Sequence, residues 1–193
     1  MLELRGNPGT HDIPLAMDFL RGVRSVDSSQ PVMIPKYDKS QFGGLGDRAP
    51  EEHWTRVTAK PDIVILEGWC MGFMKLDEAE MANAPAELAA VNKYMDEFAQ
   101  LYNELDLMLV VKIAKTQWVF DWRAQAENMM KASGKSGMSD EQIRDFVSRF
   151  MPSYDAYLPG LYESPPMDDV LLFEIDQQRV PVAAERKTAR AKM

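Results

Sequence analysis

The pattern of apolar and polar positions is most distinctive from Pro61 to Trp69, which reads P-D-I-V-I-L-E-G-W. Ile63 to Leu66 form an unbroken apolar run with β-branched residues, which is typical of a parallel strand buried on both faces. Glu67 would then lie at the carboxyl end of this strand, the edge at which open α/β sheets bind ligands. The alternative for this carboxylate is a solvated position in the loop after the strand.

Two further apolar patterns extend this strand into a larger motif. From 85 to 105, apolar residues recur at helical spacing and predict an amphipathic helix. The run L-M-L-V-V-K-I at 107 to 113 predicts a second buried strand. A strand, a helix and a strand in this order predict a right-handed βαβ unit from 62 to 113, and therefore an α/β fold.

Shorter signals predict the remaining elements. Asp12 can cap a helix that has Pro14 in its first turn. Ser139 and Gln142 have the spacing of a capping box at the start of another helix. A helix is also expected at 116 to 131, and strands are expected at 32 to 34 and 170 to 175.

Composition indicates an ordinary globular protein. The 193 residues are 46% hydrophobic and 27% charged, and we expect a single domain over residues 1 to 179. The formal net charge of −8 argues against a nucleic-acid partner or an anionic membrane surface. Residues 180 to 193 are the basic exception, with Arg190 and Lys192 near the end, and we expect this tail to be solvated and disordered.

Cysteine usage and hydropathy bear on the compartment. Cys70 is the only cysteine, so no intramolecular disulfide can form, and we expect this side chain to pack in the core. No apolar run approaches the length of a membrane span, and the first residues do not resemble a signal peptide. These features predict a cytoplasmic protein.

A G-K-S sequence at 134 to 136 matches the end of a Walker A phosphate-binding loop. The motif needs glycine five positions before Gly134, where Met129 stands, and it needs a strand before the loop rather than a helix. We therefore interpret this segment as a spacer between two helices.

Five segments taken together resemble one family. They resemble glycerate kinase and its fungal ATP-binding relatives, within the P-loop kinases that also include uridine kinase, pantothenate kinase and phosphoribulokinase. The resemblance runs from about Leu4 to Arg179 and implies a parallel sheet flanked by helices. The segments are R-G-N-P-G-T-H-D at 5 to 12, P-K-Y-D-K-S with G-D-R at 35 to 48, D-I-V-I-L-E-G-W at 62 to 69, W-R-A-Q-A-E at 122 to 127 and M-P-S-Y at 151 to 154.

The sequence departs from the family pattern at one point. Members of the family begin with a strand, a Walker A loop and a helix, followed by an acidic D-D-F-Y-like segment that supplies the proposed catalytic base. Both segments would lie upstream of Met1. The resemblance therefore implies a P-loop-kinase-like sheet without its first βα unit, and without the loop that binds the ATP phosphates.

The resemblance also implies roles for individual residues. Glu67 matches the strand-end acid that helps to hold Mg²⁺ through water, and it is a candidate catalytic residue together with Asp12. Arg5 would pair with a carboxylate of the acceptor substrate. The implied acceptor-binding residues are Arg5, His11, Tyr37, Lys39 and Arg48.

Two cations match positions that related kinases place on a lid over the transferring phosphate. These are Lys115 and Arg123. An ordinary solvated helix face is the alternative for both, because surface lysine and arginine residues are abundant.

The implied function is transfer of the ATP γ-phosphate to a hydroxyl group of a small acid such as glycerate, with ATP and Mg²⁺ as cofactors. The chain itself is expected to be inactive without a Walker A loop. The alternative is a shortened, non-catalytic paralogue that acts as a binding or regulatory module. Missing strands would leave 62 to 67 and 107 to 113 with an unpaired edge, which predicts self-association.

Overall fold

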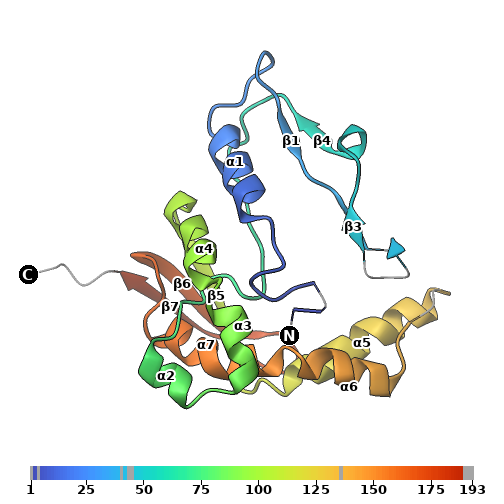
Figure 1. The fold of residues 1–193 in the computed structure, drawn as a ribbon, viewed down its shortest axis with the longest axis vertical. Coiled ribbons are helices and arrows are strands. Elements are labelled where there is room, and N and C mark those ends of the chain that lie inside the picture. Colours follow the sequence, from blue (N-terminus) through green and yellow to red (C-terminus); the bar gives the residue numbers. More distant parts are fainter. Residues whose placement is uncertain (1, 4, 40, 43–45, 135–136, 189–193) are drawn as a thin grey trace, which may run out of the picture. The chain divides into compact units, whose positions relative to one another are not determined.

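The computed structural model describes residues 2–3, 5–39, 41–42, 46–134 and 137–188 of a mixed α/β protein (Figure 1). Two compact units are present. The sheet unit comprises Gly72–Lys93 and Asp106–Met193, and the loop unit comprises Leu2–Met71 and Tyr94–Leu105. Each unit is described by itself below.

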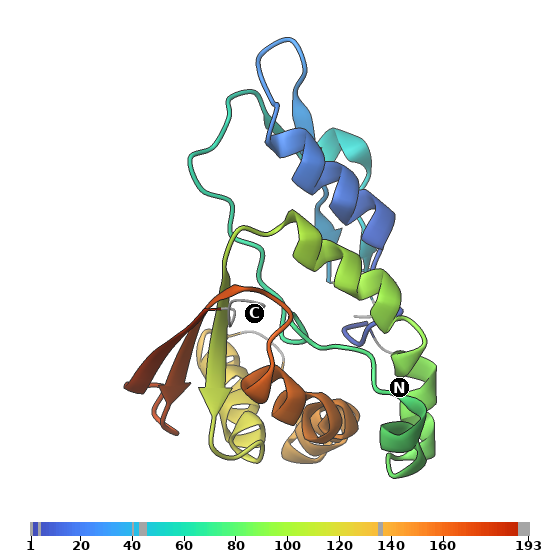
Figure 2. The same ribbon diagram turned by 90° about the vertical axis from the view of Figure 1, so that its left-hand side faces the viewer.

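The sheet unit contains three strands in the order β5 (Met108–Ile113), β6 (Asp169–Ile175) and β7 (Pro181–Thr188). β5 and β6 are parallel, whereas β6 and β7 are antiparallel (Figure 2). This confirms the strands predicted at 107 to 113 and 170 to 175. Burial alternates along β5, where Met108 and Val110 are buried while Leu109 and Val111 are exposed. One face of the sheet is therefore covered, and the other face is apolar but open at β5.

The basic tail predicted from residue 180 is instead strand β7 as far as residue 188. Both cations of β7 have partners: Arg186 forms an ion pair with Asp169 at 2.9 Å, and Lys187 Nζ donates to the carbonyl of Tyr162 at 2.6 Å. The prediction of disorder was wrong here because main-chain pairing to β6 and these contacts hold a polar sequence in place. Arg190 and Lys192 lie outside the described residues.

Helices of the sheet unit begin largely where the sequence predicts them. The capping box is confirmed: Gln142 N donates to Ser139 Oγ at 3.2 Å, and Ser139 N donates to Gln142 Oε1 at 2.8 Å. Tyr162 connects the last helix to the sheet, because its hydroxyl accepts from Ile113 N at 3.2 Å. The helical segments are α2 (Glu78–Ala82), η3 (Ala86–Leu88), α3 (Ala89–Asn92), α5 (Trp118–Ala132), α6 (Asp140–Ser148) and α7 (Met151–Glu163).

A buried amide secures the segment before α2. Asn92 Oδ1 accepts from Leu76 N at 2.9 Å, and its Nδ2 donates to the Leu76 carbonyl at 3.0 Å. The Tyr157 hydroxyl donates to the same oxygen at 3.1 Å, and the Tyr157 ring stacks on Phe73. The Asn92 amide therefore satisfies both main-chain hydrogen-bonding groups of the partly buried Leu76, as a neighbouring strand would.

In the described residues, the loop unit contains the α-helices α1 and α4, two 3-10 helices, two short two-stranded antiparallel sheets and connecting loops. The Asp12 cap is confirmed: its Oδ1 accepts from Leu15 N at 3.0 Å at the start of α1. The strand at 32 to 34 is also confirmed and pairs with β4. The elements are α1 (Ile13–Val23), β1 (Val32–Ile34), β2 (Tyr37–Asp38), β3 (Asp47–Arg48), η2 (Glu51–His53), β4 (Thr55–Val57), α4 (Met95–Ala99) and η4 (Gln100–Glu104).

The single helix predicted over 85 to 105 is divided into η3, α3, α4 and η4. Its apolar stripe is nevertheless correct, because Leu88, Val91, Met95 and Phe98 are all buried. The periodic pattern fixes which side chains are buried, but a continuous α-helical ladder is not needed for that burial.

The segment predicted as a strand at 62 to 67 has no regular secondary structure and pairs with no strand among the described residues. Ile63 is 78% exposed and Ile65 is 87% exposed. The prediction was wrong because an apolar run is buried as a strand only when a neighbouring strand and covering layers are present. The βαβ unit predicted from 62 to 113 is therefore not formed by the described residues.

Two smaller predictions concern Cys70 and membrane spans. Cys70 is buried as expected, and burial raises the pKa of its thiol to about 12. None of the described helices combines the length and the apolarity needed to cross a bilayer. Lys135 and Ser136 of the G-K-S sequence lie outside the described residues.

Two glycines in the sheet unit should respond oppositely to alanine. Gly72 has φ +92°, and an added Cβ would lie 2.5 Å from Leu161 Cδ1, so we expect Gly72→Ala to destabilise the fold by more than about 1 kcal/mol. Gly160 lies within α7 and an added Cβ would meet nothing within 4 Å, so Gly160→Ala should stabilise by up to about 1 kcal/mol. Urea unfolding measures both, and equal effects would contradict this packing.

Candidate active site

The segment Arg5–Asp12, here the acceptor loop, is held by hydrogen bonds within itself. Gly6 N donates to Thr10 Oγ1 at 2.9 Å, and this hydroxyl donates to the Asn7 carbonyl at 2.7 Å. Asn7 is fully buried. Gly9 has φ +99°, and a Cβ there would collide with the ring of Tyr94. The turn-rich sequence is therefore a compact, well-defined loop.

Asp12 connects the acceptor loop to the β2–β3 hairpin. Besides capping α1, its carboxylate accepts from Arg48 Nη2 at 2.6 Å. The hydrogen bond from Leu15 N, followed by the one from Arg48, lowers the pKa of Asp12 below its usual range. Asp12 is therefore ionised at neutral pH, and it orients the Arg48 guanidinium.

Tyr37 and Arg5 extend this cluster. Tyr37 is directly opposite Arg48 in the hairpin, and the Arg5 guanidinium lies over the Tyr37 ring, 5.4 Å from its centroid. Gly46 has φ +79°, and a Cβ there would lie 2.5 Å from the Tyr37 ring. The structure thus brings Arg5, Tyr37, Arg48 and Asp12 into one series of contacts, which we call the acceptor cluster.

His11 precedes Asp12 and packs edge-on against Phe98, with ring centroids 5.3 Å apart. Although part of the side chain is exposed, desolvation of the ring lowers its pKa. The neutral imidazole is thus favoured at physiological pH, so His11 would offer one hydrogen-bond donor and one acceptor rather than a positive charge.

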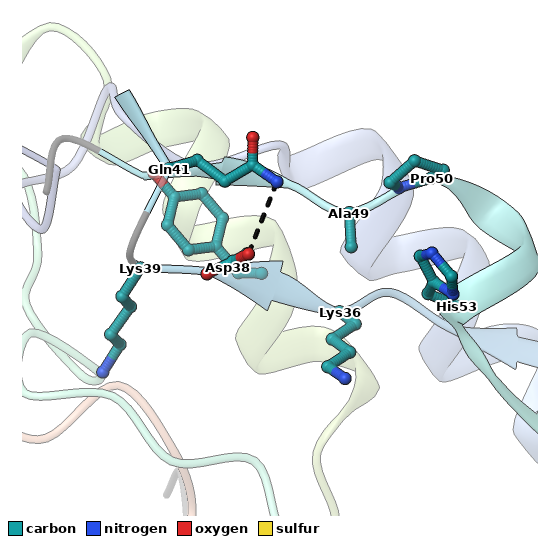
Figure 3. Close-up of a pocket in the computed structure, with 8 residues that line it drawn as sticks. Lys36, Asp38, Lys39, Gln41, Ala49, Pro50 and His53 are labelled. Carbon is teal, nitrogen blue, oxygen red and sulfur yellow. Dashed lines mark hydrogen bonds between the residues drawn. The ribbon is translucent and has the colours of Figure 1, made fainter. Parts of the chain in front are cut away.

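Lys39 lies beside this cluster and lines a hollow of about 630 Å³ (Figure 3). Lys36 and His53 contribute to the same hollow, and Gln41 Nε2 donates to Asp38 Oδ2 at 3.4 Å. The wall near Ala49 is fixed by Trp54, whose indole N–H donates to the Ala49 carbonyl at 2.7 Å. Two lysines around an open hollow are suited to a small anion.

Glu67 is exposed and lies in the irregular segment of the loop unit that follows Pro61. Two residues later, the indole N–H of Trp69 donates to the Gly6 carbonyl at 2.7 Å, so this segment is joined to the acceptor loop. No group of three or more His, Cys, Asp or Glu that could hold a metal ion occurs among the described residues. A single carboxylate fits Mg²⁺, which keeps several waters and is commonly bound with substrate phosphates.

The two predicted lid cations belong to the sheet unit. Lys115 follows β5 and lines a hollow of about 690 Å³ together with Thr116 and Asp155. Arg123 forms an ion pair with Glu127 and lies 5.1 Å from the centroid of the Phe146 ring. Arg123 is therefore not on an ordinary solvated face, because its guanidinium connects α5 to α6.

Sequence reasoning missed three side chains that shape the site. Tyr94 packs against Gly9, Trp54 bonds to the Ala49 carbonyl, and Trp69 bonds to the Gly6 carbonyl. Trp69 stands in the E-G-W segment beside Glu67, and tryptophan with a partly buried indole usually has a hydrogen-bond acceptor. That preference was the signal available in the sequence.

Several known proteins are similar to this chain. The chloroplastic D-glycerate 3-kinase of Arabidopsis thaliana is 37% identical over 190 residues, which cover 95% of this chain and 42% of that protein. The kinase mug58 of Schizosaccharomyces pombe is 33% identical over 193 residues, 94% of this chain and 69% of its own length. "Probable ATP-dependent kinase TDA10" of Saccharomyces cerevisiae is 33% identical over 190 residues, which cover 93% of this chain and 65% of that protein. No protein-family model matches the chain.

A solved structure is similar as well. The D-glycerate 3-kinase of Cryptococcus neoformans matches with a TM-score of 0.83 and 32% identity, over 95% of this chain and 69% of that one. The fold and the sequence together define a kinase-related mixed α/β protein. The chain belongs to the family of D-glycerate 3-kinase and the fungal kinases mug58 and TDA10, and it spans less than half the length of the plant member.

Replacing Asp12 should separate its two roles. Asp12→Asn retains a capping oxygen but loses the exposed ion pair, so we expect a loss of only about 0.2–1 kcal/mol. Asp12→Ala loses both contacts and should cost about 1–2 kcal/mol. Because the folded-state pKa is lowered, the ion-pair difference should be present at pH 7 and disappear as the pH falls through the folded-state pKa. Urea unfolding across pH measures this, and equal losses in the two variants would exclude the cap.

Proposed function

We propose that this chain is part of a small-molecule kinase that transfers the γ-phosphate of ATP to a hydroxyl group of a small acid such as D-glycerate. The observation that carries the proposal is the acceptor cluster, in which two arginines, a tyrosine and an ionised carboxylate are held together. Membership of the glycerate kinase family supports this choice of substrate class.

Each residue of the cluster has a role in this proposal. Arg5 would bind the acceptor carboxylate, because a guanidinium and a carboxylate form two parallel charge-assisted hydrogen bonds. Neutral His11 would hold an acceptor hydroxyl group. Asp12 would keep Arg48 directed at the substrate, and Tyr37 with Lys39 would complete the wall. Phosphoryl transfer depends mainly on such positioning and on charge neutralisation.

ATP and Mg²⁺ would require further groups. Glu67 would hold Mg²⁺ through water, and Lys115 would neutralise phosphate charge. Arg123 would also contact the phosphate only if its ion pair with Glu127 were broken. The 193 residues contain no G-x-x-x-x-G-K-[ST] sequence, and we propose that a βα unit with this loop completes the sheet in the family fold. The open apolar face at β5 supports this completion, and so does the segment at 62 to 67, which pairs with no strand of the described residues.

The second candidate is a non-catalytic binding or regulatory module that retains the acceptor cluster. This candidate is supported by the acceptor cluster alone, whose contacts all lie within the loop unit. Calorimetric titration with ATP and Mg²⁺ distinguishes the two candidates. Micromolar nucleotide affinity would exclude the second one, whereas acid binding without nucleotide binding would support it.

Arg5 provides the direct test of acid binding. We expect the chain to bind D-glycerate in calorimetry and Arg5→Ala to weaken binding at least about tenfold, because a hydrogen bond to a charged group contributes about 1.5–3 kcal/mol. Arg56→Ala is the matched control, since Arg56 is an exposed arginine on β4 of the same unit. Equal weakening by the two variants would reduce the effect to net charge and contradict the assigned role.

We also propose that the protein is cytoplasmic and acts as one kinase-like domain. When the 193 residues are isolated from the proposed βα unit, we expect them to self-associate through the uncovered edge of β5. The Leu109→Lys/Val111→Lys variant should shift the chain from oligomer towards monomer in light scattering, because charges on an exposed edge oppose strand pairing. Met129→Lys is the control, at a 70% exposed apolar residue outside the sheet. A monomeric parent chain that melts cooperatively above about 60 °C, at the upper end for ordinary domains, would contradict the proposal.

A further inference from the structure

A hydrogen bond from Trp69 joins the two segments of the loop unit that carry the proposed substrate and metal residues. Trp69 Nε1 donates to the Gly6 carbonyl at 2.7 Å across 63 positions of sequence, and the contact is partly buried. Arg5 immediately precedes Gly6, and Glu67 lies two residues before Trp69. The bond therefore sits between the acid-binding arginine and the candidate metal-binding carboxylate.

The backbone conformation of Gly6 explains why this hydrogen bond is needed to fix the acceptor loop. Gly6 has φ +132°, a region open mainly to glycine, so backbone preference alone does not fix the direction of its carbonyl. On the other side of the residue, Gly6 N is bound to Thr10 Oγ1. The indole thus fixes the Gly6–Asn7 peptide plane, while the Arg5–Gly6 peptide is held by the bond from Gly6 N to Thr10 Oγ1.

We propose that Trp69 is a positioning residue: its indole N–H holds the acceptor loop at a set distance from the Glu67 segment, and so directs Arg5 at the carboxylate of a small hydroxy acid. This inference rests on the proposed function. Phosphoryl transfer needs the attacking hydroxyl about 3–3.5 Å from the reacting phosphorus. A loop that binds the acid must therefore keep its spacing from the groups that hold the metal and phosphate.

Two other tryptophans make the same kind of hydrogen bond, and Trp122 provides the matched control. Trp54 Nε1 donates to the Ala49 carbonyl and Trp122 Nε1 to the Gln177 carbonyl, each at 2.7 Å. Trp122 belongs to the sheet unit. Trp69→Phe and Trp122→Phe hence remove the same kind of bond while keeping an aromatic ring, and they differ in whether that bond reaches the acceptor loop.

The experiment combines calorimetry with D-glycerate and amide hydrogen exchange of the ligand-free chain, well below the melting temperature. Trp69→Phe should weaken acid binding about fivefold, since one neutral hydrogen bond contributes about 1 kcal/mol. It should also speed exchange in the acceptor loop. Trp122→Phe should change neither the acid affinity nor the exchange rate of the acceptor loop. This should hold even if the two variants lower the melting temperature equally.

The experiment separates the role of Trp69 from the proposed acid binding. Unchanged acid affinity in Trp69→Phe would overturn the inference while leaving the proposed function intact. The same holds if Trp122→Phe weakens acid binding as much as Trp69→Phe does. Unchanged exchange in the acceptor loop would also overturn it, because the bond would then not order the loop. If the parent chain binds no D-glycerate, the proposed function fails and the inference fails with it.

Discussion

The arrangement of the loop unit depends on the carboxylate of Asp12. One oxygen caps α1 and the other accepts from Arg48, so the same side chain fixes where a helix starts and where a hairpin lies. The pair is exposed, and such ion pairs contribute little free energy by themselves. Its importance is geometric, because Arg48 and Tyr37 are paired in the hairpin and Arg5 lies over Tyr37.

The sequence correctly predicted helix starts and strands that depend only on residues close together in the chain. The Asp12 cap, the capping box at Ser139 and the strand at 107 to 113 are each specified by neighbouring residues, and each is present. The segment 62 to 67 was misjudged because its burial depends on a partner strand that no pattern within it supplies. β7 was missed because the charged residues Glu185, Arg186 and Lys187 are not typical of a strand. They form one here because their main chain pairs with β6.

The candidate site was predictable as a set of residues but not as a set of contacts. Resemblance selected Arg5, Tyr37 and Arg48, and the structure brings them together. It did not indicate that Arg123 is engaged by Glu127, although their spacing of four residues permits an ion pair on one helix. The contribution of Trp69 depends on a carbonyl far away in the sequence, which no local pattern reveals.

The two edges of the sheet differ in a way that limits how copies can assemble. β7 begins with Pro181 and carries Glu185, Arg186 and Lys187, features that discourage further strand addition. β5 presents exposed Leu109 and Val111, and its charged residue, Lys112, forms an ion pair with Glu174 of the neighbouring strand at 3.0 Å. If only one edge strand of a sheet is available for pairing, two copies can pair through it about a twofold axis. No edge strand is then left to bind a third copy. Association through β5 would therefore end in a closed pair rather than a growing fibre.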